Sequence, residues 1–392
     1  MASSILFVSP WLHDGGIERN LAVKAPWLAA RGHRVAVAAW HISATLAGRP
    51  NPVVQTLRAA GVPIYRLGGH ARRRELAHRA LHLAALVART RSRVVVGHEM
   101  QANVVTVLAG LLLARVPRVI LELHNAPPRD VAGARRARVG WVYRRADGIV
   151  AVSENLRRDA IEQFALSGDR VTSIHNPFDL AELGRLAAQP LPPEAPATPY
   201  VVACGRFVPD KAFGDLLAAF AVLARERPLG LVLIGDGPLR ESLVRTAQAL
   251  GVGDRVVLPG FVANPFPWFA NAAAFVSSSH TESFSRVVVE AMACGVPVIA
   301  SRCEGPQEIL AGGAFGRLYD VGATDQLVTA LRDVLSGTSG LVEAARRRAE
   351  EFEAARILPR LAAYYRGEAA SHRAEPFPRD ARQIASELSG HR

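Results

Sequence analysis

Two carboxylates, Glu282 and Glu290, stand in the segment 280–297 with seven residues between them. An apolar run precedes the segment, and Gly295 begins a glycine–proline stop signal for a helix. Glu282 is therefore expected in the loop after a strand, and Glu290 about one and a half turns into the helix. The first N–H groups of that helix, over Ser285–Val288, are predicted to be unpaired and to attract a phosphate. Carboxylates accept hydrogen bonds from sugar hydroxyls, so the pattern favours a ligand of hydroxylated rings joined by a diphosphate.

A purely structural interpretation of the two carboxylates is the alternative. Glu282 would then be an acid favoured by the helix dipole, and Glu290 would be a surface residue. Glu290 fits this poorly, because a charge on an apolar helix face is costly without partners. Its apolar neighbours are Val287, Val288, Val289, Ala291, Met292 and Ala293. We therefore expect both carboxylates to bind a ligand.

Arg206 and Lys211 form a second candidate group after the first strand of the chain's second half. Gly205 allows the backbone to turn there, so both cations are expected at the carboxyl end of that strand. Two cations in this position can hold a diphosphate and stabilise it as a leaving group. Besides Lys24, Lys211 is the only lysine among 47 basic residues, which favours a role for a compact point charge. An ordinary charged surface loop is the alternative.

Glycine turns and one histidine complete the candidates. In the segment Asp14–Glu18, the adjacent Gly15 and Gly16 let backbone N–H groups approach an anion. Gly235 lies in a similar strand-to-helix turn, and a plain tight turn is an equal interpretation of both. His124 follows the apolar run 119–123, where it can hydrogen-bond an acceptor or a sugar hydroxyl, and a structural histidine is the equal alternative.

Elements that position these residues alternate between short apolar runs and longer helical patterns. Such alternation is typical of a parallel sheet with helices on both faces. Helices are expected over 16–31, 71–90, 103–113 and from Phe284 or Ser285 onward. Strands are expected at 5–8, 35–39, 94–96, 119–123, 148–152 and 171–174, and then at 200–204, 231–234, 255–258, 274–277 and 298–300. We predict an α/β protein of two doubly wound, Rossmann-like domains whose strand ends face a central cleft.

The domain boundary is expected at a proline-rich linker. Five prolines within 189–199 indicate a stiff connection. We therefore expect an N-terminal domain over 1–188 and a C-terminal domain over 200–345. The remaining segment, 346–392, is expected to begin as a helix and to end in a polar tail, 370–392. The sequence leaves open whether it crosses back to the first domain.

Composition and charge narrow the class of protein. Hydrophobic residues make up 49% of the chain, which allows a buried core. The net charge is +12, with basic clusters at 72–74, 135–138 and 144–145 that can touch anionic lipid. A solvated arginine-rich surface is the equal alternative. No aromatic residues are interleaved with the clusters as a base-stacking platform requires, so nucleic acid is not expected as a partner.

Localisation and cofactors follow mainly from missing signals. No apolar stretch reaches the about 18–20 residues that cross a bilayer, and the N-terminus does not resemble a signal peptide. The three cysteines show no paired spacing, so we expect a cytoplasmic protein with reduced thiols. The sequence contains no DxD pair, P-loop, HExxH or GxSxG motif, so neither metal-assisted chemistry nor a serine nucleophile is expected.

Taken together, these motifs resemble those of the retaining GT-B glycosyltransferases of family 4. The resemblance extends over most of the chain, from Gly15–Glu18 to about Tyr365. Its most specific part is the Glu282-to-Glu290 element with the Ala291–Ile299 segment that follows it. The Gly305–Leu310 segment is similar to one in members that build surface polysaccharides and glycans.

The resemblance implies transfer of a sugar from a nucleotide-diphosphate-sugar donor to a glycan, lipid-linked or small-molecule acceptor. The N-terminal domain would bind the acceptor and the C-terminal domain the donor, with no metal or other cofactor. Glu282 would bind the transferred sugar and Glu290 the ribose. Arg206 and Lys211 would hold the diphosphate, and His124 would lie near the sugar, so His124, Glu282, Arg206 and Lys211 are the expected catalytic group. Further expected donor-binding residues are Gly15, Gly16, Gly235, Phe261, Val262, Phe284, Ser285, Arg286 and Val287.

The implied mechanism is front-side attack, in which a donor phosphate oxygen takes the acceptor's proton. The chain departs from its relatives at Ser283 and Ser285, where glycine is common, and a serine fits there only with a negative φ. Arg286 adds a cation that either favours the phosphates or points to solvent. Peripheral contact of the N-terminal half with the anionic inner face of the cytoplasmic membrane is also expected, because lipid-linked acceptors are common in the family.

Two other functions remain open at this point. One is a non-catalytic protein that binds a nucleotide sugar. The other is a different GT-B enzyme, such as an epimerase or a phosphorylase, although the Glu282-to-Glu290 element with Arg206 and Lys211 argues against an epimerase.

Overall fold

The computed structural model describes residues 3–13, 15–46, 48–68, 75–113, 117–125, 134–337 and 340–368. The chain divides into two compact units, Met1–Phe178 with Ala354–Ala374 and Asp179–Glu353 with Glu375–Arg392. Ala354 N donates to Phe178 O at 2.7 Å, so the points where the chain leaves and re-enters unit 1 lie side by side. Asp14, the basic cluster 72–74 and the tail 370–392 fall outside the described residues.

Unit 1 is built on a parallel sheet of seven strands in the order β5-β2-β1-β6-β7-β8-β9. Because both faces of such a sheet are covered, its central strands are largely apolar. A short antiparallel pair, β3 (Thr45–Leu46) and β4 (Arg49–Pro50), lies apart from this sheet. The seven strands are β1 (Ser4–Leu12), β2 (Arg34–Ile42), β5 (Ile64–Arg66), β6 (Val94–His98), β7 (Arg118–Leu123), β8 (Gly148–Ala151) and β9 (Val171–Ser173).

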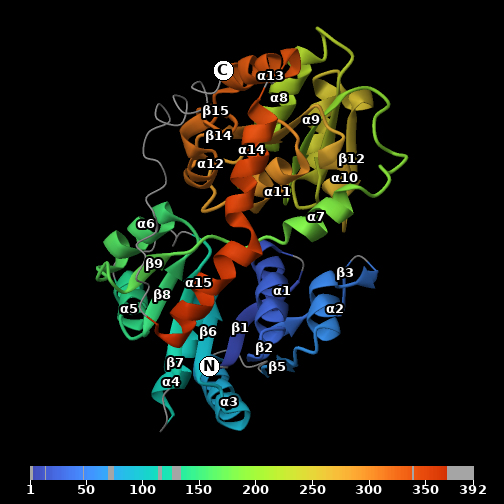
Figure 1. Ribbon diagram of the computed structural model, residues 1–392. Coiled ribbons are helices and arrows are strands. Elements are labelled where there is room, and N and C mark those ends of the chain that lie inside the picture. The colour runs from blue at the N-terminus through green and yellow to red at the C-terminus, as the bar shows by residue number, and fades with distance from the viewer. Residues whose placement is uncertain are drawn as a thin grey trace. The chain divides into compact units, whose positions relative to one another are not determined.

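Helices cover both faces of this sheet (Figure 1). Alternate residues of β1 point to opposite faces, so Ile5 and Phe7 join one core and Leu6 and Val8 the other. The first core is closed by α1 (Gly16–Ala29), α2 (Pro52–Ala59) and α15 (Ala354–Arg366). The second is closed by α3 (Glu75–Thr90) and α4 (Glu99–Leu111), and α5 (Ala134–Tyr143) and α6 (Glu154–Phe164) complete the unit. α15, the last helix within the described residues, therefore belongs to the core of unit 1.

Unit 2 repeats this plan with a parallel sheet of six strands in the order β12-β11-β10-β13-β14-β15. A core cluster joins the sheet to α8, α9 and α13. The strands are β10 (Tyr200–Cys204), β11 (Gly230–Ile234), β12 (Val256–Gly260), β13 (Ala274–Ser277), β14 (Val298–Ser301) and β15 (Arg317–Tyr319). The helices are α7 (Leu180–Ala187), α8 (Phe213–Leu223), α9 (Arg240–Ala249), α10 (Phe266–Ala270), α11 (Arg286–Cys294), α12 (Glu304–Ile309), α13 (Thr324–Ser336) and α14 (Leu341–Ala349).

The architecture confirms the α/β class and the two parallel sheets, but the connection differs from the expected linker. The chain passes between the units at Phe178–Asp179. The proline-rich segment 189–199 instead joins α7 to β10 inside unit 2 and contains no helix or strand. The reason is that α7 already packs on α10 and α11, so the chain has entered unit 2 before the prolines begin.

Candidate functional site

The loop that follows β13 is held against the turn Pro209–Lys211. Ser278 Oγ donates to Lys211 O at 2.8 Å, and His280 N donates to Asp210 O at 2.8 Å. β10 and β13 are neighbours in a parallel sheet, so the segments that follow them meet at its carboxyl edge. The fold thereby brings Lys211 of one candidate group beside the loop that carries Glu282 of the other.

Lys211 and Glu282 are in direct contact there. The Lys211 ammonium donates to Glu282 Oε1, and Ser279 Oγ donates to the same oxygen at 3.2 Å. The backbone of Glu282 is also fixed, because Gly305 N donates to its carbonyl oxygen at 2.8 Å. The side chains stay partly open, with 24% of Lys211 and 16% of Glu282 exposed. The pair is therefore held in place and yet accessible to a ligand.

Ser285 stands directly before α11 with φ at 70°, in the left-handed region. A serine was expected to fit here only with a negative φ, and this condition is not met, because the position has the conformation that glycine adopts most easily. Among the described residues, the buried Ser285 Oγ has no hydrogen-bond partner. The expected run of unpaired N–H groups is also shorter, because Val288 N donates to Ser285 O at 3.2 Å. A strained, unsatisfied serine thus marks the start of this helix.

Glu290 lies one turn into α11 and is 3% exposed. Arg286 Nη2 lies 3.5 Å from Glu290 Oε1, on the same face of the helix. A cation four residues earlier is a partner that such a buried carboxylate requires. Of the neighbouring candidates, Phe284 is buried and Val287 is half-buried.

The remaining candidates of unit 2 follow the ends of β10, β11 and β12. A side chain on Gly235 would put its Cβ 1.9 Å from Gly205 O, so only glycine fits there. Gly235 N donates to Gly260 O at 2.9 Å, which ties these strand ends together. Arg206 and Phe261 are exposed, the latter to 41%, and Val262 is half-buried.

Unit 1 holds three of the expected residues. Gly15 is the N-cap of α1 and Gly16 its first residue. His124 directly follows β7 and is only 7% exposed. His124 Nε2 lies 3.0 Å from His98 Nδ1 and 3.3 Å from Glu122 Oε2.

His124 is therefore one member of a buried charge cluster, which comprises Lys24, His98, Glu122, His124 and Tyr365. Lys24 Nζ donates to Glu122 Oε2 at 2.5 Å, and the Tyr365 hydroxyl donates to Glu122 Oε1. His98 Nδ1 lies 3.3 Å from Glu122 Oε2. Glu122 and His98 are fully buried, and Lys24 is 3% exposed.

The charge states in the buried charge cluster are set by burial and by the Lys24 ammonium. Burial alone would raise the pKa of Glu122, but the Lys24 ammonium and the two imidazoles bring it well below its usual range. Burial lowers the pKa of His98 to about 3, so this imidazole is neutral at pH 7. Burial and the Glu122 carboxylate raise the pKa of Tyr365, so its hydroxyl keeps its proton. Glu122 is thus a carboxylate paired with a lysine.

Sequence reasoning did not find this cluster, although the sequence contains a signal for it. Glu122 interrupts the apolar run 119–123, and Lys24 lies on the buried face of its helix beside Leu21, Ala25 and Leu28. Charges at two such buried positions predict each other, because neither is tolerated without a partner. Ser279 also went unnoticed, because nothing in its spacing distinguishes it from its serine neighbours.

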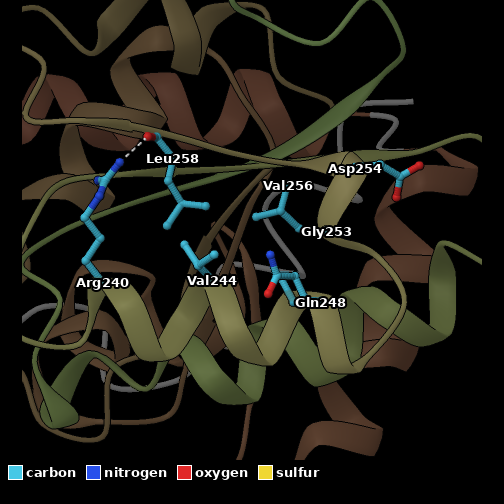
Figure 2. Close-up of a pocket in the computed structure, with 8 residues that line it drawn as sticks. Arg240, Val244, Gln248, Gly253, Asp254, Val256 and Leu258 are labelled. Atoms are coloured by element: carbon cyan, nitrogen blue, oxygen red, sulfur yellow. Dashed lines mark hydrogen bonds between the residues drawn. The ribbon is translucent and has the colours of Figure 1, made fainter.

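A pocket of about 550 Å³ lies elsewhere in unit 2, between α9 and β12 (Figure 2). Arg240 Nη2 donates across it to Leu258 O at 2.9 Å. None of the residues expected to bind a ligand lines this pocket. We therefore place the candidate site of unit 2 at the carboxyl edge of its sheet, where Lys211 and Glu282 are in contact.

Comparison with protein families matches both halves of the chain. A family model described as Glycosyltransferase Family 4 matches residues 14–182, and one described as Glycosyl transferases group 1 matches residues 198–337. Together the two matches leave only the connecting segment and the two ends of the chain unmatched.

Similar proteins come from several bacteria. The chain is 27% identical over 198 residues to the N-acetylgalactosamine-N,N'-diacetylbacillosaminyl-diphospho-undecaprenol 4-alpha-N-acetylgalactosaminyltransferase of Campylobacter jejuni, covering 50% of this chain and 53% of that protein. It is 36% identical over 141 residues to the lipopolysaccharide core biosynthesis glycosyltransferase LpsE of Rhizobium meliloti, covering 36% and 41% respectively. The match thus spans about half the length of these curated relatives.

A similar fold occurs in the crystal structure of Anabaena Alr3699/HepE in complex with UDP and glucose. The TM-score is 0.78 at 20% identity, with 93% of this chain and 100% of that chain covered. The GT-B fold predicted from the sequence is thereby confirmed.

Proposed function

We propose that this chain, which belongs to the group 1, family 4 glycosyltransferases, transfers a sugar from a nucleotide-diphosphate-sugar donor to an acceptor hydroxyl. The observation that carries the proposal is the accessible Lys211–Glu282 pair beside the start of α11. A cation and a hydroxyl-binding carboxylate in contact suit a ligand in which a sugar is joined to a diphosphate. UDP and glucose in the crystal structure of HepE support the same ligand class.

Within unit 2, each candidate side chain then has a role. Lys211 and the exposed Arg206 hold the diphosphate, and Glu282 accepts hydrogen bonds from the sugar. Glu290 accepts from the ribose, with Arg286 balancing its charge at 3.5 Å. The buried Ser285 Oγ, unsatisfied within the described residues, donates to a phosphate oxygen. Phe261, exposed after β12, offers an aromatic face for the base.

The proposed reaction keeps the anomeric configuration and needs no metal ion. The bond between the anomeric carbon and the donor phosphate oxygen breaks while the acceptor oxygen bonds to the same face of that carbon. The acceptor's proton passes to a donor phosphate oxygen, so no side chain acts as nucleophile. Lys211 and Arg206 stabilise the negative charge of the leaving diphosphate, and the enzyme's contribution is positional and electrostatic.

Lipid-linked or surface glycans are the acceptors that we propose. The printed names of the two curated relatives refer to a diphospho-undecaprenol-linked glycan and to the lipopolysaccharide core. Within the described residues, no helix combines the length and apolar character needed to cross a bilayer. Access to such acceptors then requires contact with the membrane surface.

That contact is proposed at α5 of unit 1. Arg138, Trp141 and Arg145 follow each other at helical spacing, and Arg145 Cζ lies 3.5 Å above the Trp141 ring, which is 40% exposed. Arginine and tryptophan suit the headgroup region of an anionic bilayer. In co-sedimentation with phosphatidylglycerol vesicles at low salt, R138A/R145A binds several-fold less than wild type, and R317A, an exposed arginine of unit 2, binds as wild type does. Equal binding of all three, or none, contradicts this contact.

A thermal-stability screen tests the donor class. UDP-, GDP- and ADP-sugars are each added in large excess, and the donor raises the melting temperature, because a ligand at about 100 times its Kd adds about 2.7 kcal/mol. The same donor gives a smaller rise with E290Q, because the amide keeps one acceptor oxygen for the ribose hydroxyls where the carboxylate has two. No rise with any of these nucleotide sugars contradicts the proposed donor class.

A further inference from the structure

The buried charge cluster joins elements that are far apart along the chain. Lys24 comes from α1, His98 from the end of β6, Glu122 from β7 and Tyr365 from α15. Lys24 and Glu122 are separated by 98 residues, and Glu122 and Tyr365 by 243. His124 is the member that follows a strand end, at the edge of the sheet where parallel α/β folds bind ligands. The cluster therefore connects the interior of unit 1 to its candidate site.

The ion pair alone does not explain this arrangement. A buried pair is costly to desolvate and is often no more stable than apolar residues of the same size. Lys24 and Tyr365 already occupy both oxygens of Glu122 with hydrogen bonds. The two imidazoles nevertheless converge on Oε2, each with a nitrogen at 3.3 Å. Their placement indicates a role beyond stability.

A metal ion is one explanation for two histidines and a carboxylate. The three ligand-type atoms are 3.0, 3.3 and 3.3 Å apart. Atoms that surround a tetrahedral ion at about 2.0–2.2 Å stand about 3.3 Å from each other, so the spacing alone fits. Lys24 Nζ, however, already lies 2.5 Å from the same carboxylate oxygen and balances its charge. A divalent ion would leave two positive charges uncompensated in a buried place, so the geometry does not favour it.

We propose that Glu122 is a positioning residue, which together with His98 fixes the imidazole of His124 through Nε2. Any ligand contact of His124 is then made through its other ring nitrogen, Nδ1. In a histidine the hydrogen bond at one nitrogen sets the orientation of the ring and the state of the other nitrogen. Lys24 keeps Glu122 ionised for this purpose, and Tyr365 holds its second oxygen. This inference depends on the proposed function in one respect, namely that His124 contacts the donor or the acceptor.

A double-mutant cycle tests whether Glu122 acts through His124. The assay is hydrolysis of the nucleotide sugar selected by the thermal screen, over a range of concentrations. E122Q and H124N each lower kcat at least tenfold and change the donor KM less than threefold, because the side chains proposed to hold the donor lie in unit 2. The variant E122Q/H124N is no slower than H124N alone. Losses that multiply in the double variant overturn the proposal, since independent effects add in free energy.

Fold controls separate positioning from stability. E122Q leaves the Lys24 ammonium buried and unpaired, whereas K24M/E122Q removes both charges and restores most of the lost melting temperature. If Glu122 positions His124, the activity of K24M/E122Q stays at least tenfold below that of wild type. If the activity recovers together with the melting temperature, the proposal is overturned. Y365F and Y364F form a matched pair on α15. Y365F lowers kcat several-fold, whereas Y364F, which loses a hydroxyl bonded to the backbone of Ile149, keeps wild-type kcat.

Two measurements give an answer without activity. In nitrogen-15 NMR of histidine-labelled protein, the signals missing from H124N belong to His124, and E122Q shifts its Nε2 signal while Y364F does not. An unchanged signal in E122Q overturns the proposal, as does one equivalent of tightly bound metal that is lost in H98N. Absence of hydrolysis of any donor by wild type instead contradicts the proposed function and leaves these two readouts to decide.

Discussion

The only two lysines of the chain, Lys24 and Lys211, each pair with a glutamate, one in each unit, and the two pairs differ in exposure. Lys24 and Glu122 are exposed by 3% and 0%, whereas Lys211 and Glu282 are exposed by 24% and 16%. The same two chemical groups thus occur once inside a core and once at a strand edge. In a chain rich in arginine, both places retain the compact ammonium.

The difference in burial teaches what each pair can do. In the interior neither ion has water as an alternative partner, so the Lys24–Glu122 pair stays together and can fix its neighbours. At the edge the pair is partly exposed, so water and ligands can replace either partner at a smaller cost than in the interior. The Lys211–Glu282 pair can therefore open and give its ammonium to a phosphate and its carboxylate to a sugar.

Breaking the buried pair has the largest expected effect. K24M leaves the Glu122 carboxylate buried without its cation, and we expect a loss of about 3–5 kcal/mol in the free energy of unfolding. Urea unfolding measures this, with K211M as the matched variant at the exposed pair, where the loss is below about 1 kcal/mol. Equal losses in K24M and K211M would remove the distinction between the two pairs.

For the Lys211–Glu282 pair we expect a large effect on activity and a small effect on stability. K211A lowers donor turnover at least about 100-fold, because one group that stabilises developing charge is lost, while the melting temperature changes little. Steady-state kinetics and a thermal scan on the same sample check both statements. Turnover within threefold of wild type contradicts the phosphate role of Lys211.

Acid sharpens the comparison through His98. Its pKa is about 3 in the folded protein against 6.5 for a free histidine, so only the unfolded chain takes up this proton between those values. Stability therefore falls as the pH drops from about 6.5 towards 3, by up to about 1.4 kcal/mol per pH unit from this residue. Urea unfolding at a series of pH values measures how the free energy of unfolding changes with pH. The H98N variant is expected to show a smaller change. The control variant H78N, at an exposed position of α3, leaves this pH dependence unchanged. If H98N also leaves it unchanged, the assignment of the effect to His98 is contradicted.

The smallest expected effect is at Ser285. Replacing a serine in the left-handed region by glycine removes about 1–2 kcal/mol of backbone strain. The greater conformational freedom of glycine in the unfolded chain costs about 0.5–1 kcal/mol of stability. S285G is thus expected to raise stability by about 1 kcal/mol or less, while the donor-induced rise in melting temperature becomes smaller because a hydroxyl is lost. A stability loss of more than about 1 kcal/mol would show that the serine hydroxyl supports the fold.

Much of the fold could be predicted because the central strands are apolar on both faces. The runs 5–8 and 200–204 lie within strands β1 and β10 of the structure. The edge strands β5 and β15 went unpredicted, because each is only three residues long and includes an arginine, Arg66 or Arg317, so that no apolar run marks it. The start of α4 at Glu99 was also missed, because Glu99 turns the chain at φ 70°, a conformation that its residue type does not signal.

The candidate site likewise has parts that could be predicted from the sequence and parts that could not. Lys211 and Glu282 were each found from a local motif, but their contact required the neighbouring positions of β10 and β13 in the sheet. The buried charge cluster depends on contacts between distant parts of the chain, and Tyr365 reaches it only because α15 returns to unit 1. The left-handed φ of Ser285 could not be predicted, since serine seldom adopts this conformation and the position is strained.

Release of nucleoside diphosphate and free sugar from the selected nucleotide sugar tests the central claim most directly. Wild type is expected to hydrolyse the donor slowly without an acceptor, and E282A is expected to lose at least about 100-fold of that rate while the fold is retained. Binding of the nucleotide sugar with no turnover by wild type, or equal turnover by E282A, would contradict the account and leave a non-catalytic binding protein as the better description.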